Sequence, residues 1–486
     1  MLIPLIVACA LFMENLDSSV LATALPSIAA DLGESPLKLN LAITSYLFAL
    51  AVFIPVSGWV ADRFGARTVF RAAIAVFTIG SLLCGFADSF WFLVGARVLQ
   101  GLGGAMMVPV GRLVMLRSIP KAELVRAIAW LTVPALIGPV IGPPLGGFLT
   151  TYLSWRWIFW INLPIGLLGM VLVTLYIPNI REENVPALDW RGFAFSAIGL
   201  LGLVFGFETI GRELLPDTAV AGLLLAGAIG VALYLRHARR HPHPLLDLSL
   251  LKIPTFRAGI AGGFLFRIGT GALPFLLPMM LQLGFGLSAF ESGMVTFASA
   301  AGALTMKMAA GPILRWLGFR HVLIGNALIS GAFIAVCGFF RPEMSYALIF
   351  ALLLLGGFFR SLQFTSVNTL TISDVSNERM SRATSFTSMM QQLSLSAGVA
   401  VGALILHVTV SLNGAPTIGP ADFMPAFFSV GVAAMLSALL FLRLPADAGA
   451  EVSGHRLVAP TQRLSQGTPA PKPGAPAPAP GSHPAE

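Results

Sequence analysis

The sequence predicts an all-α polytopic membrane protein, and two observations support this fold class. Of its 486 residues, 56% are hydrophobic and only 11% are charged, which is too little charge to cover a soluble protein of this size. The hydrophobic residues also form long uninterrupted runs. Such runs match the roughly 20 residues that a helix needs to cross a bilayer, and they argue against the short alternating strands of a membrane β-barrel.

Polar residues, prolines and glycines divide these runs into fourteen expected transmembrane helices. The first run continues through Glu14 and Asp17 and has no basic segment before it, so we take it as a helix and not as a cleaved signal peptide. The expected spans are 3–28, 40–60, 68–87, 90–114, 122–150, 156–178, 190–208, 219–236, 256–282, 291–312, 320–340, 345–371, 382–410 and 422–443.

The distribution of positive charge predicts the orientation in the membrane. Lys and Arg concentrate in loops after even-numbered spans, such as 61–71 and 236–257, whereas the opposite loops hold Lys38, Arg212 and Arg341. The positive-inside rule then places both termini in the cytoplasm, and we expect the inner membrane of a bacterium. The net charge of +8 is scattered through short loops. We therefore expect a lipid bilayer as surroundings and no nucleic acid as partner.

Other protein classes are not indicated. Cys9, Cys84 and Cys337 lie in apolar runs at unrelated spacings, which favours neither a disulfide framework nor a metal site. No loop has room for an ATPase domain and no GxxxxGK[ST] motif occurs, so any transport must be driven by a gradient. Because no nucleophile, base and orienting group stand together, we expect neither an enzyme nor a cofactor. We also expect the protein to be a monomer.

Three sequence matches indicate an internal repeat. They pair Gly58, Gly65 and Arg67 with Gly311, Gly318 and Arg320, then Arg97 and Gln100 with Arg360 and Gln363, then Gly138 and Gly142 with Gly398 and Gly402. The repeat predicts two pseudo-symmetric six-helix bundles around a central transport site. We place these bundles at 1–180 and 256–444, two inserted helices with a basic cytoplasmic loop at 181–255, and a disordered Pro- and Ala-rich cytoplasmic tail at 445–486.

Five stretches resemble the major facilitator superfamily, and within it the fourteen-helix drug:proton antiporters. They are LDSSVLATALP at 16–26, GWVADRFGARTVF at 58–70, RVLQGLGGAMMVP at 97–109, GPVIGPPLGG at 138–147 and WRWIFWINLPIG at 155–166. The last two are characteristic of the antiporter branch. The resemblance implies alternating access, with export of small molecules coupled to the entry of protons.

A charged group deep in an apolar span is a functional-site hypothesis by default. Arg97 costs roughly 2.5 kcal/mol or more to insert, and its alternatives are snorkelling or a structural ion pair. Glu14 and Asp17 lie one turn apart on the same face of the first helix. We expect Asp17 to exchange protons with Arg97 as its gating partner, and we place Glu14 second. Alternatively, Asp17 stays ionised and pairs with Arg97 permanently.

The remaining deep polar groups are expected to line the substrate cavity. In the superfamily the first and fourth helices of each half line it, which implies that Arg97, Gln100, Arg267, Arg360 and Gln363 face it, with Lys307 nearby. Four cations against two carboxylates would leave a formal charge of +2, which favours an anion, a zwitterion or a neutral amphiphile. The alternative for each cation is snorkelling or structural pairing.

Two motifs have conformational roles by resemblance. Gly58, Asp62, Arg63 and Arg67 form the expected ionic latch after the second helix, where Gly58 permits close helix contact. The alternative is a basic loop with incidental pairing.

The second motif lies on the fifth helix. Gly138, Gly142 and Gly146 lie four residues apart on one smooth face of this helix. Together with Pro139, Pro143 and Gly147 they predict a hinge or seal, and the alternative is ordinary helix packing.

The histidines of RHARRHPHP at 236–244 could bind a metal, but adjacent arginines repel cations and a basic loop facing anionic lipid is the ordinary interpretation. We predict no metal site.

The sequence thus predicts a proton-coupled exporter of amphiphilic, drug-like molecules. The alternative is an exporter of organic anions such as carboxylates, metal chelates or siderophore-like compounds. A facilitative importer or a membrane sensor is less favoured.

Overall fold

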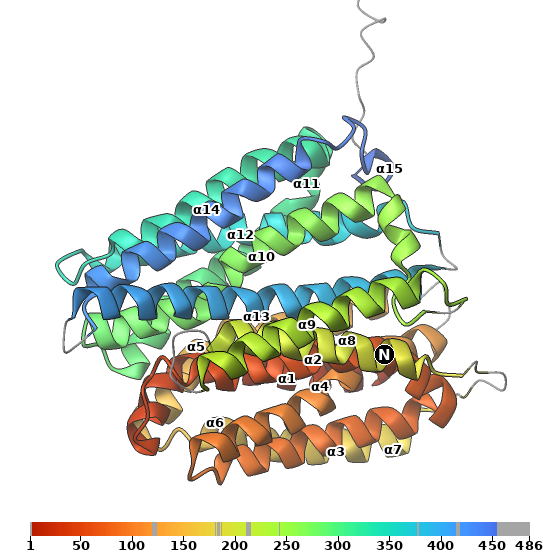
Figure 1. Cartoon of the computed structure of the whole chain (residues 1–486), viewed down its shortest axis with the longest axis horizontal. Helices are drawn as coiled ribbons and strands as arrows, with labels where there is room; N and C mark the ends of the chain where they lie inside the picture. Colours follow the sequence, from red (N-terminus) through yellow and green to blue (C-terminus); the bar gives the residue numbers. More distant parts are fainter. Residues whose placement is uncertain are drawn as a thin grey trace, which may run out of the picture.

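A computed structural model shows a bundle of long helices in two groups (Figure 1). The structure describes residues 2–118, 124–179, 181, 185, 187–209, 215–242, 244–376, 379–414 and 418–453. Within these residues the regular structure is entirely helical, which confirms the predicted fold class.

The N-terminal half contains six spans, and the last of them is broken near its start. Its helices are α1 (Leu2–Leu32), α2 (Asn40–Phe64), α3 (Ala66–Gly85), α4 (Phe90–Ser118), α5 (Leu124–Tyr152), α6 (Trp157–Trp160) and α7 (Asn162–Tyr176). The inserted pair is α8 (Trp190–Thr209) and α9 (Asp217–Ala238), followed by the short η2 (Leu248–Lys252).

The C-terminal half repeats the pattern. Its elements are α10 (Pro254–Met279), η3 (Met280–Gly284), α11 (Ala289–Val336), η4 (Cys337–Phe339), α12 (Tyr346–Ser373), α13 (Met380–Asn413), η6 (Pro420–Phe423), α14 (Met424–Phe441) and α15 (Ala450–Ser453).

The number of spans is compatible with fourteen. Twelve described helices are long and apolar enough to cross a membrane. One of them, Ala289–Phe339, consists of two helices joined at Gly318, where the backbone is not helical (φ 72°, ψ 162°). The 29-residue helix α5 lies outside that group of twelve and supplies one further span.

The internal repeat appears in the backbone. Gly65, between α2 and α3, has φ 92°, and its sequence counterpart Gly318 has φ 72°. Both values lie in the region that favours glycine, since a Cβ there meets neighbouring backbone atoms. Gly138 packs against α1, and its counterpart Gly398 packs in the same way against α10. The weak sequence matches therefore mark equivalent positions in two similar halves.

The two halves meet along two seams that the pseudo-symmetry relates. On one seam α5 packs against the first part of α11, and on the other α2 packs against α13. The inserted helix α8 contacts both α2 and α13, with Phe53 and Phe193 rings 5.8 Å apart. In Figure 1 the inserted pair lies across the middle of the molecule, so these helices cover the α2–α13 seam.

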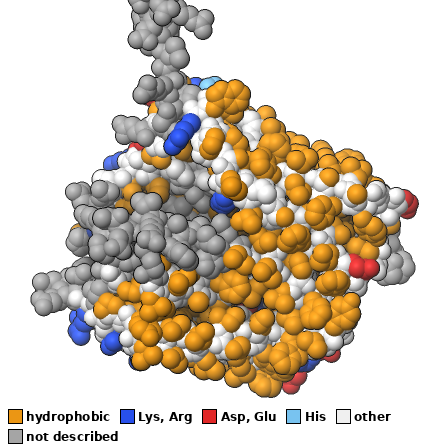
Figure 2. Space-filling model, turned by 180° about the vertical axis from the view of Figure 1, so that it is seen from behind, with side chains coloured by type: hydrophobic (Ala, Val, Ile, Leu, Met, Phe, Trp, Pro, Cys, Tyr) orange, Lys and Arg blue, Asp and Glu red, His pale blue; other side chains and the backbone are white. Residues whose placement is uncertain are grey.

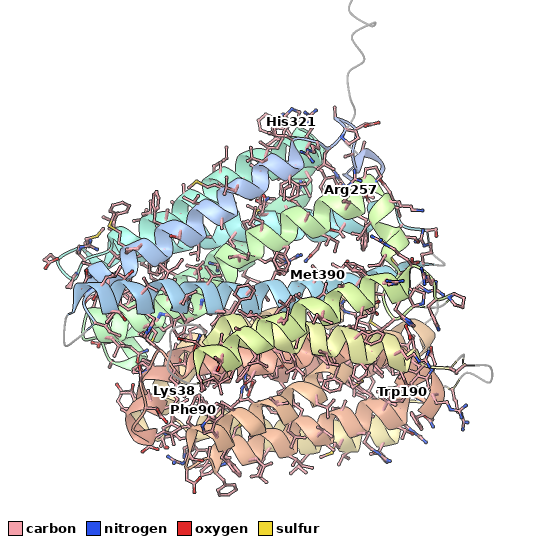
Figure 3. The ribbon with its side chains drawn as sticks, viewed as in Figure 1. Lys38, Phe90, Trp190, Arg257, His321 and Met390 are labelled. Atoms are coloured by element: carbon pink, nitrogen blue, oxygen red, sulfur yellow. The ribbon has the colours of Figure 1, made fainter. Side chains whose placement is uncertain are left out.

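The surface has the distribution of charge expected for a membrane protein. Figure 2 shows a broad hydrophobic surface, with most visible Lys and Arg at the left and most visible Asp and Glu at the right. In Figure 3, Lys38 and Phe90 mark one end of the bundle, and Trp190, Arg257 and His321 lie at the other. Exposed leucines such as Leu167 and Leu175 on α7 form part of the lipid-facing belt.

The first residues of the expected tail are ordered. Residues 445–453 form turns and α15, Ala448 is buried, and Gly449 lies against Phe319. These residues therefore pack as part of the C-terminal half, which corrects the boundary at Pro445. Residues 454–486, the rest of the predicted tail, lie outside the described residues.

Replacing Gly318 by Ala should destabilise the fold, because alanine at φ 72° is strained by about 1–3 kcal/mol. The thermal midpoint of the detergent-solubilised protein should fall. Gly311→Ala is the matched control, since Gly311 lies in the same helix and a Cβ there meets no atom within 4 Å. Equal midpoints for the two variants would contradict the strained-turn assignment.

Candidate functional site

A buried ion pair lies at the centre of the N-terminal half. Arg97 on α4 donates to Asp17 on α1 across 2.6 Å, and both side chains are 1% exposed. The Arg97 Nε donates to the Ala42 carbonyl on α2 at 3.1 Å. The guanidinium also lies 4.3 Å from the centre of the Tyr46 ring, where a cation–π interaction stabilises it further. Arg97 is therefore internally compensated and does not snorkel.

Amides complete the shell around Asp17. Gln100 and Asn162 donate to Asp17 Oδ1 at 2.8 and 3.0 Å. Both amides also donate to the Ser81 hydroxyl, which donates to the Phe159 carbonyl at 2.9 Å. Four helices and the α6 turn thus contribute to one network. Sequence reasoning found Arg97, Gln100 and Asp17 but missed Asn162, although it lies within the WRWIFWINLPIG stretch.

Glu14 differs from Asp17 in having an unmatched oxygen. The Glu14 side chain is 8% exposed, and its Oε2 has no hydrogen-bond partner among the described residues. A buried carboxylate in this situation is costly unless the oxygen carries a proton. Glu14 and Asp17 therefore lie one turn apart on α1 with different surroundings.

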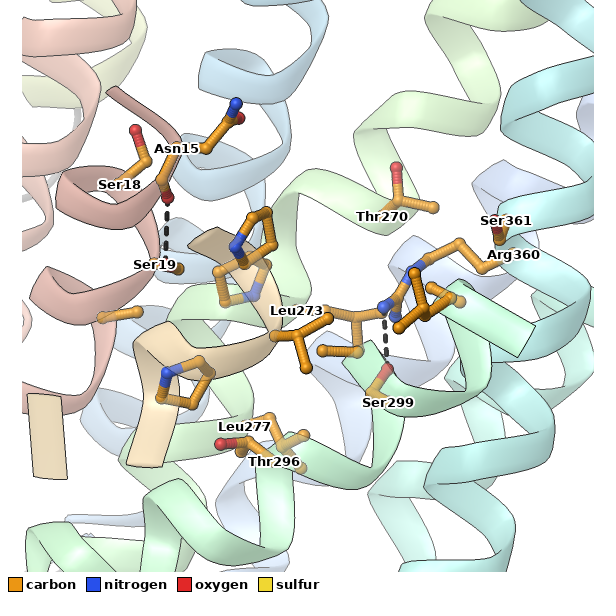
Figure 4. A pocket seen from close by; sticks show the side chains of 18 of the residues that line it. Asn15, Ser18, Ser19, Thr270, Leu273, Leu277, Thr296, Ser299, Arg360 and Ser361 are labelled. Carbon is orange, nitrogen blue, oxygen red and sulfur yellow. Dashed lines mark hydrogen bonds between the residues drawn. The ribbon is translucent and has the colours of Figure 1, made fainter. Parts of the chain in front are cut away.

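A cavity of about 470 Å³ lies between the halves (Figure 4). Helices α1 and α5 supply one wall, and α10, α11, α12 and α13 supply the other. Its lining is mainly apolar with scattered hydroxyl and amide groups, a composition typical of sites for amphiphilic small molecules. The polar uncharged lining residues are Asn15, Ser18, Ser19, Thr23, Thr270, Thr296, Ser299 and Ser361.

The charged lining residues are cations. Arg360 on α12 donates to the Ser299 hydroxyl at 2.7 Å, the contact drawn in Figure 4, and Lys307 on α11 donates to Thr365 at 2.9 Å. No Asp or Glu is among the described lining residues, and neither cation has a salt bridge within the described chain. The cavity wall therefore carries positive charge without a built-in counter-charge.

The expectation that all the deep polar groups share this cavity is wrong for this conformation. Arg97, Gln100, Glu14 and Asp17 are buried inside the N-terminal half and do not line it.

Two deep polar groups of the C-terminal half, Arg267 and Gln363, are also buried away from the cavity. Arg267 is 1% exposed and donates to Asn368 at 2.6 Å. Gln363 bonds with Asn326 and the Leu323 carbonyl, both at 3.0 Å. Whether these side chains reach the cavity depends on how each helix is rotated about its axis, and residue spacing along the chain does not determine that rotation.

The cavity wall formed by α1 has a recognisable pattern in the sequence. Asn15, Ser18, Ser19 and Ala22 follow the i, i+3, i+4, i+7 spacing of one helix face, and all four line the cavity. Small polar residues at this spacing in an apolar span could have identified the α1 wall.

The cavity is closed at one end by direct contacts between the halves. Gln282 donates to the Thr23 carbonyl at 2.8 Å, and the Phe290 amide donates to Thr151 at 3.1 Å. A side chain at Gly147 would collide with the Ala289 carbonyl, so glycine is required for this close approach. This end carries the loops with few basic residues.

The glycines of α5 face two ways. Side chains at Gly138, Gly142 and Gly146 would all meet α1, so these three form the predicted smooth face. Gly147 faces α11 instead, while Pro139 and Pro143 line the cavity. Residues of this one motif therefore pack against α1, line the cavity and contact α11 at the closed end.

The predicted latch lies at the turn between α2 and α3. Asp62 and Arg63 end α2, Arg67 is in the first turn of α3, and Gly65 between them reverses the chain direction. A Cβ at Gly58 would meet no atom within 4 Å. Within the part of the chain that the structure describes, Gly58 therefore does not make the expected close helix contact in this conformation.

The structure brings one potential metal-ligand cluster together among the described residues. Asp189, His237 and His241 each place a ligand atom within 4.8 Å of the others. Sequence reasoning noted the histidines but missed Asp189, which is 48 residues from His237 and carries no local signal.

Comparisons with known proteins agree with this geometry. A sequence model described as the Major Facilitator Superfamily matches residues 7–399 and 259–472. The chain belongs to the major facilitator superfamily. This confirms the resemblance drawn from the five motifs, and the chain is a multi-pass membrane transporter of small molecules.

Curated relatives cover nearly the whole chain. The "Putative multidrug resistance protein MdtD" of Citrobacter koseri is 38% identical over 454 residues, which are 91% of this chain and 94% of the relative. The protein of the same name from Salmonella heidelberg is 39% identical with the same coverage.

Solved structures share the fold at lower sequence identity. A D-xylose-proton symporter superposes with a TM-score of 0.67 at 14% identity, covering 92% of this chain and 98% of that one. A POT family transporter in complex with 5-aminolevulinic acid gives 0.66 at 14% identity, with 90% and 94% covered.

Asp17→Asn should destabilise the protein strongly, by about 3–5 kcal/mol, because it leaves the Arg97 guanidinium buried without a counter-charge. The double variant Asp17→Asn with Arg97→Gln should recover part of that loss, measured by thermal unfolding in detergent. Asp31→Asn is the control, since its ion pair with Arg156 is exposed and worth at most about 1 kcal/mol. Equal losses from Asp17→Asn and Asp31→Asn would refute a stabilising role for the buried pair.

Proposed function

We propose that this protein is a proton-coupled exporter that moves small amphiphilic or drug-like molecules by alternating access. The observation that carries the proposal is a mainly apolar cavity between two pseudo-symmetric halves, closed at one end by α5 and α11. A rocking motion of the halves would open that end and close the other. The name of the curated relatives, multidrug resistance protein, supports drug-like substrates.

The proposed orientation follows from the loop charges. With both termini in the cytoplasm, the closed end faces away from the cytoplasm, so this conformation corresponds to the inward-facing side of the cycle. We assign the latch of Gly58, Asp62, Arg63 and Arg67 to the opposite state, since among the described residues no atom lies within 4 Å of a Cβ at Gly58 in this one. Gly147 and its α11 contact act as the seal that must open, and the unit of transport is the monomer.

Proton coupling is assigned to the carboxylates of α1. Asp17 already accepts from Arg97, Gln100 and Asn162, so protonating it requires those contacts to loosen. Glu14 Oε2 has no such partner and can take a proton without breaking a bond. Movement of α1 during the cycle would change the surroundings of both groups. Arg97 competes with the proton for Asp17, which links protonation to the position of α4.

Glu14→Gln should abolish gradient-driven accumulation of substrate in proteoliposomes while leaving substrate exchange without a gradient intact, because glutamine mimics the protonated carboxyl. Asp17→Asn should also lose coupled transport, with the loss of stability described above. Asp31→Asn should behave as wild type. Wild-type transport that is equally fast with no proton gradient would refute antiport, and normal coupling in both carboxylate variants would remove these residues from the mechanism.

Export of organic anions is a second candidate function. Arg360 and Lys307 give the cavity two cations, and none of the described lining residues is acidic. A substrate carboxylate could replace the hydroxyl contacts of Ser299 and Thr365 with charge-assisted hydrogen bonds, which are stronger. Acidic substrates, including carboxylates and metal chelates, would then bind more tightly than neutral amphiphiles of the same shape.

Arg360→Gln should weaken binding of a carboxylate ligand by about 10-fold or more, while its carboxamide analogue changes much less, since a hydrogen bond to a charged group contributes about 1.5–3 kcal/mol. Ligand titrations by calorimetry would measure both. Arg341→Gln is the control, because Arg341 donates to the Gly338 and Phe340 carbonyls outside the cavity. Equal weakening of acid and amide would argue against anion selectivity.

A further inference from the structure

We propose that Asp189, His237 and His241 form a binding site for a divalent transition-metal ion at the loop end of the inserted helices. The three residues come from the start of α8 and the end of α9, and one ligand atom of each lies within 4.8 Å of the other two. The site is separate from the transport cavity and does not depend on the proposed substrate or on proton coupling.

The two histidines are held on one face. The His241 and Arg240 amides both donate to the His237 carbonyl at 3.0 Å, so the chain turns helically beyond the end of α9. Residues four apart on a helix lie one above the other. The two imidazole rings accordingly lie 5.0 Å apart between centroids, at 30° to each other.

Asp189 is oriented before any metal binds. Its Oδ1 accepts from the Gly192 amide at 2.8 Å as part of the α8 N-terminus, and from His237 Nε2 at 2.7 Å. The Asp189 side chain is 3% exposed, whereas that of His237 is 18% exposed. A carboxylate held by a backbone amide is the kind of support that fixes a metal ligand in position. The partly exposed histidine leaves a route from solvent.

The geometry fits a small ion with modest adjustment. Zinc binds imidazole nitrogen at about 2.0–2.1 Å and carboxylate oxygen at about 2.0–2.2 Å. The His237 Nε2 to Asp189 Oδ1 distance of 2.7 Å would widen slightly, and His241 would move inward, to surround an ion. Three protein ligands would leave further positions for water.

The donor set selects the class of metal. Two neutral imidazoles and one carboxylate favour Zn²⁺, Co²⁺, Ni²⁺ or Cu²⁺ over Mg²⁺ or Ca²⁺, which prefer oxygen ligands. Arg236, Arg239 and Arg240 raise the local positive potential and lower the affinity, so the Asp189 charge is essential. A bound ion would clamp the ends of α8 and α9 together.

The proposed metal site lies beside the segment that connects the inserted helices to the C-terminal half. Asp189 Oδ2 also lies 3.4 Å from the Leu245 amide, in the segment that leads to α10. Helix α8 of the inserted pair contacts both α2 and α13 at the seam between the halves. Metal binding would therefore stiffen a connection between the inserted helices and the C-terminal half.

The test is a Co²⁺ titration of the full-length protein purified without a histidine tag, followed by visible absorption and by competition with Zn²⁺. Wild type should bind one Co²⁺ that Zn²⁺ displaces, and Zn²⁺ should raise the thermal midpoint. His241→Ala and His237→Ala should each weaken binding at least 10-fold and remove the Zn²⁺ stabilisation. Asp189→Asn should weaken binding too, although asparagine still caps α8.

His321→Ala is the matched control, because His321 lies outside the cluster and its loss should leave binding unchanged. The partly exposed position of His241 lets that variant fold even if Asp189→Asn does not. Co²⁺ binding that persists in the His237→Ala, His241→Ala double variant would overturn the proposal. Absence of binding by wild type at millimolar Co²⁺ would also overturn it and leave a simple hydrogen bond between His237 and Asp189.

Discussion

The buried ion pair of Arg97 and Asp17 is the constraint around which the N-terminal half is built. A guanidinium cannot remain in an apolar interior unless charge and hydrogen bonds compensate it. Here Asp17, the Ala42 carbonyl and the Tyr46 face provide that compensation, while Gln100 and Asn162 complete the shell of Asp17. These contacts come from α1, α2, α4 and α7. The pair therefore fixes how α1, α2, α4 and α7 are rotated relative to one another.

The C-terminal half uses the equivalent arginine differently. Arg360 matches Arg97 in the repeat, yet it bonds to the neutral Ser299 and lines the cavity. The glutamines that follow, Gln100 and Gln363, are both fully buried. Similar backbones thus carry one charge that is compensated by an ion pair, at Arg97, and one that lines the cavity, at Arg360. In the proposed mechanism, the first half handles protons and the second recognises the substrate.

Small residues decide where the halves can approach. Gly147 admits the backbone of α11 at the closed end, whereas a Cβ at Gly58 on α2 would meet no described atom within 4 Å. The contact at Gly147 is reversible in principle, since it depends on shape complementarity and few polar bonds. An alternating-access cycle needs such interfaces, because a strong polar interface at either end would trap one state.

The sequence by itself determined the membrane class, the spans, the repeat and the superfamily motifs, because hydrophobic run length and glycine positions are local properties of the chain. It also paired Arg97 with Asp17, since two opposite charges at depth must compensate each other. Only the tertiary structure decided which polar groups reach the cavity. Arg267 and Gln363 turn away from it while Asn15 and Ser299 face it, because helix rotation depends on packing among all neighbours. The meeting of Asp189 with His237 and His241 likewise required the fold, as no spacing rule connects residues on separate helices.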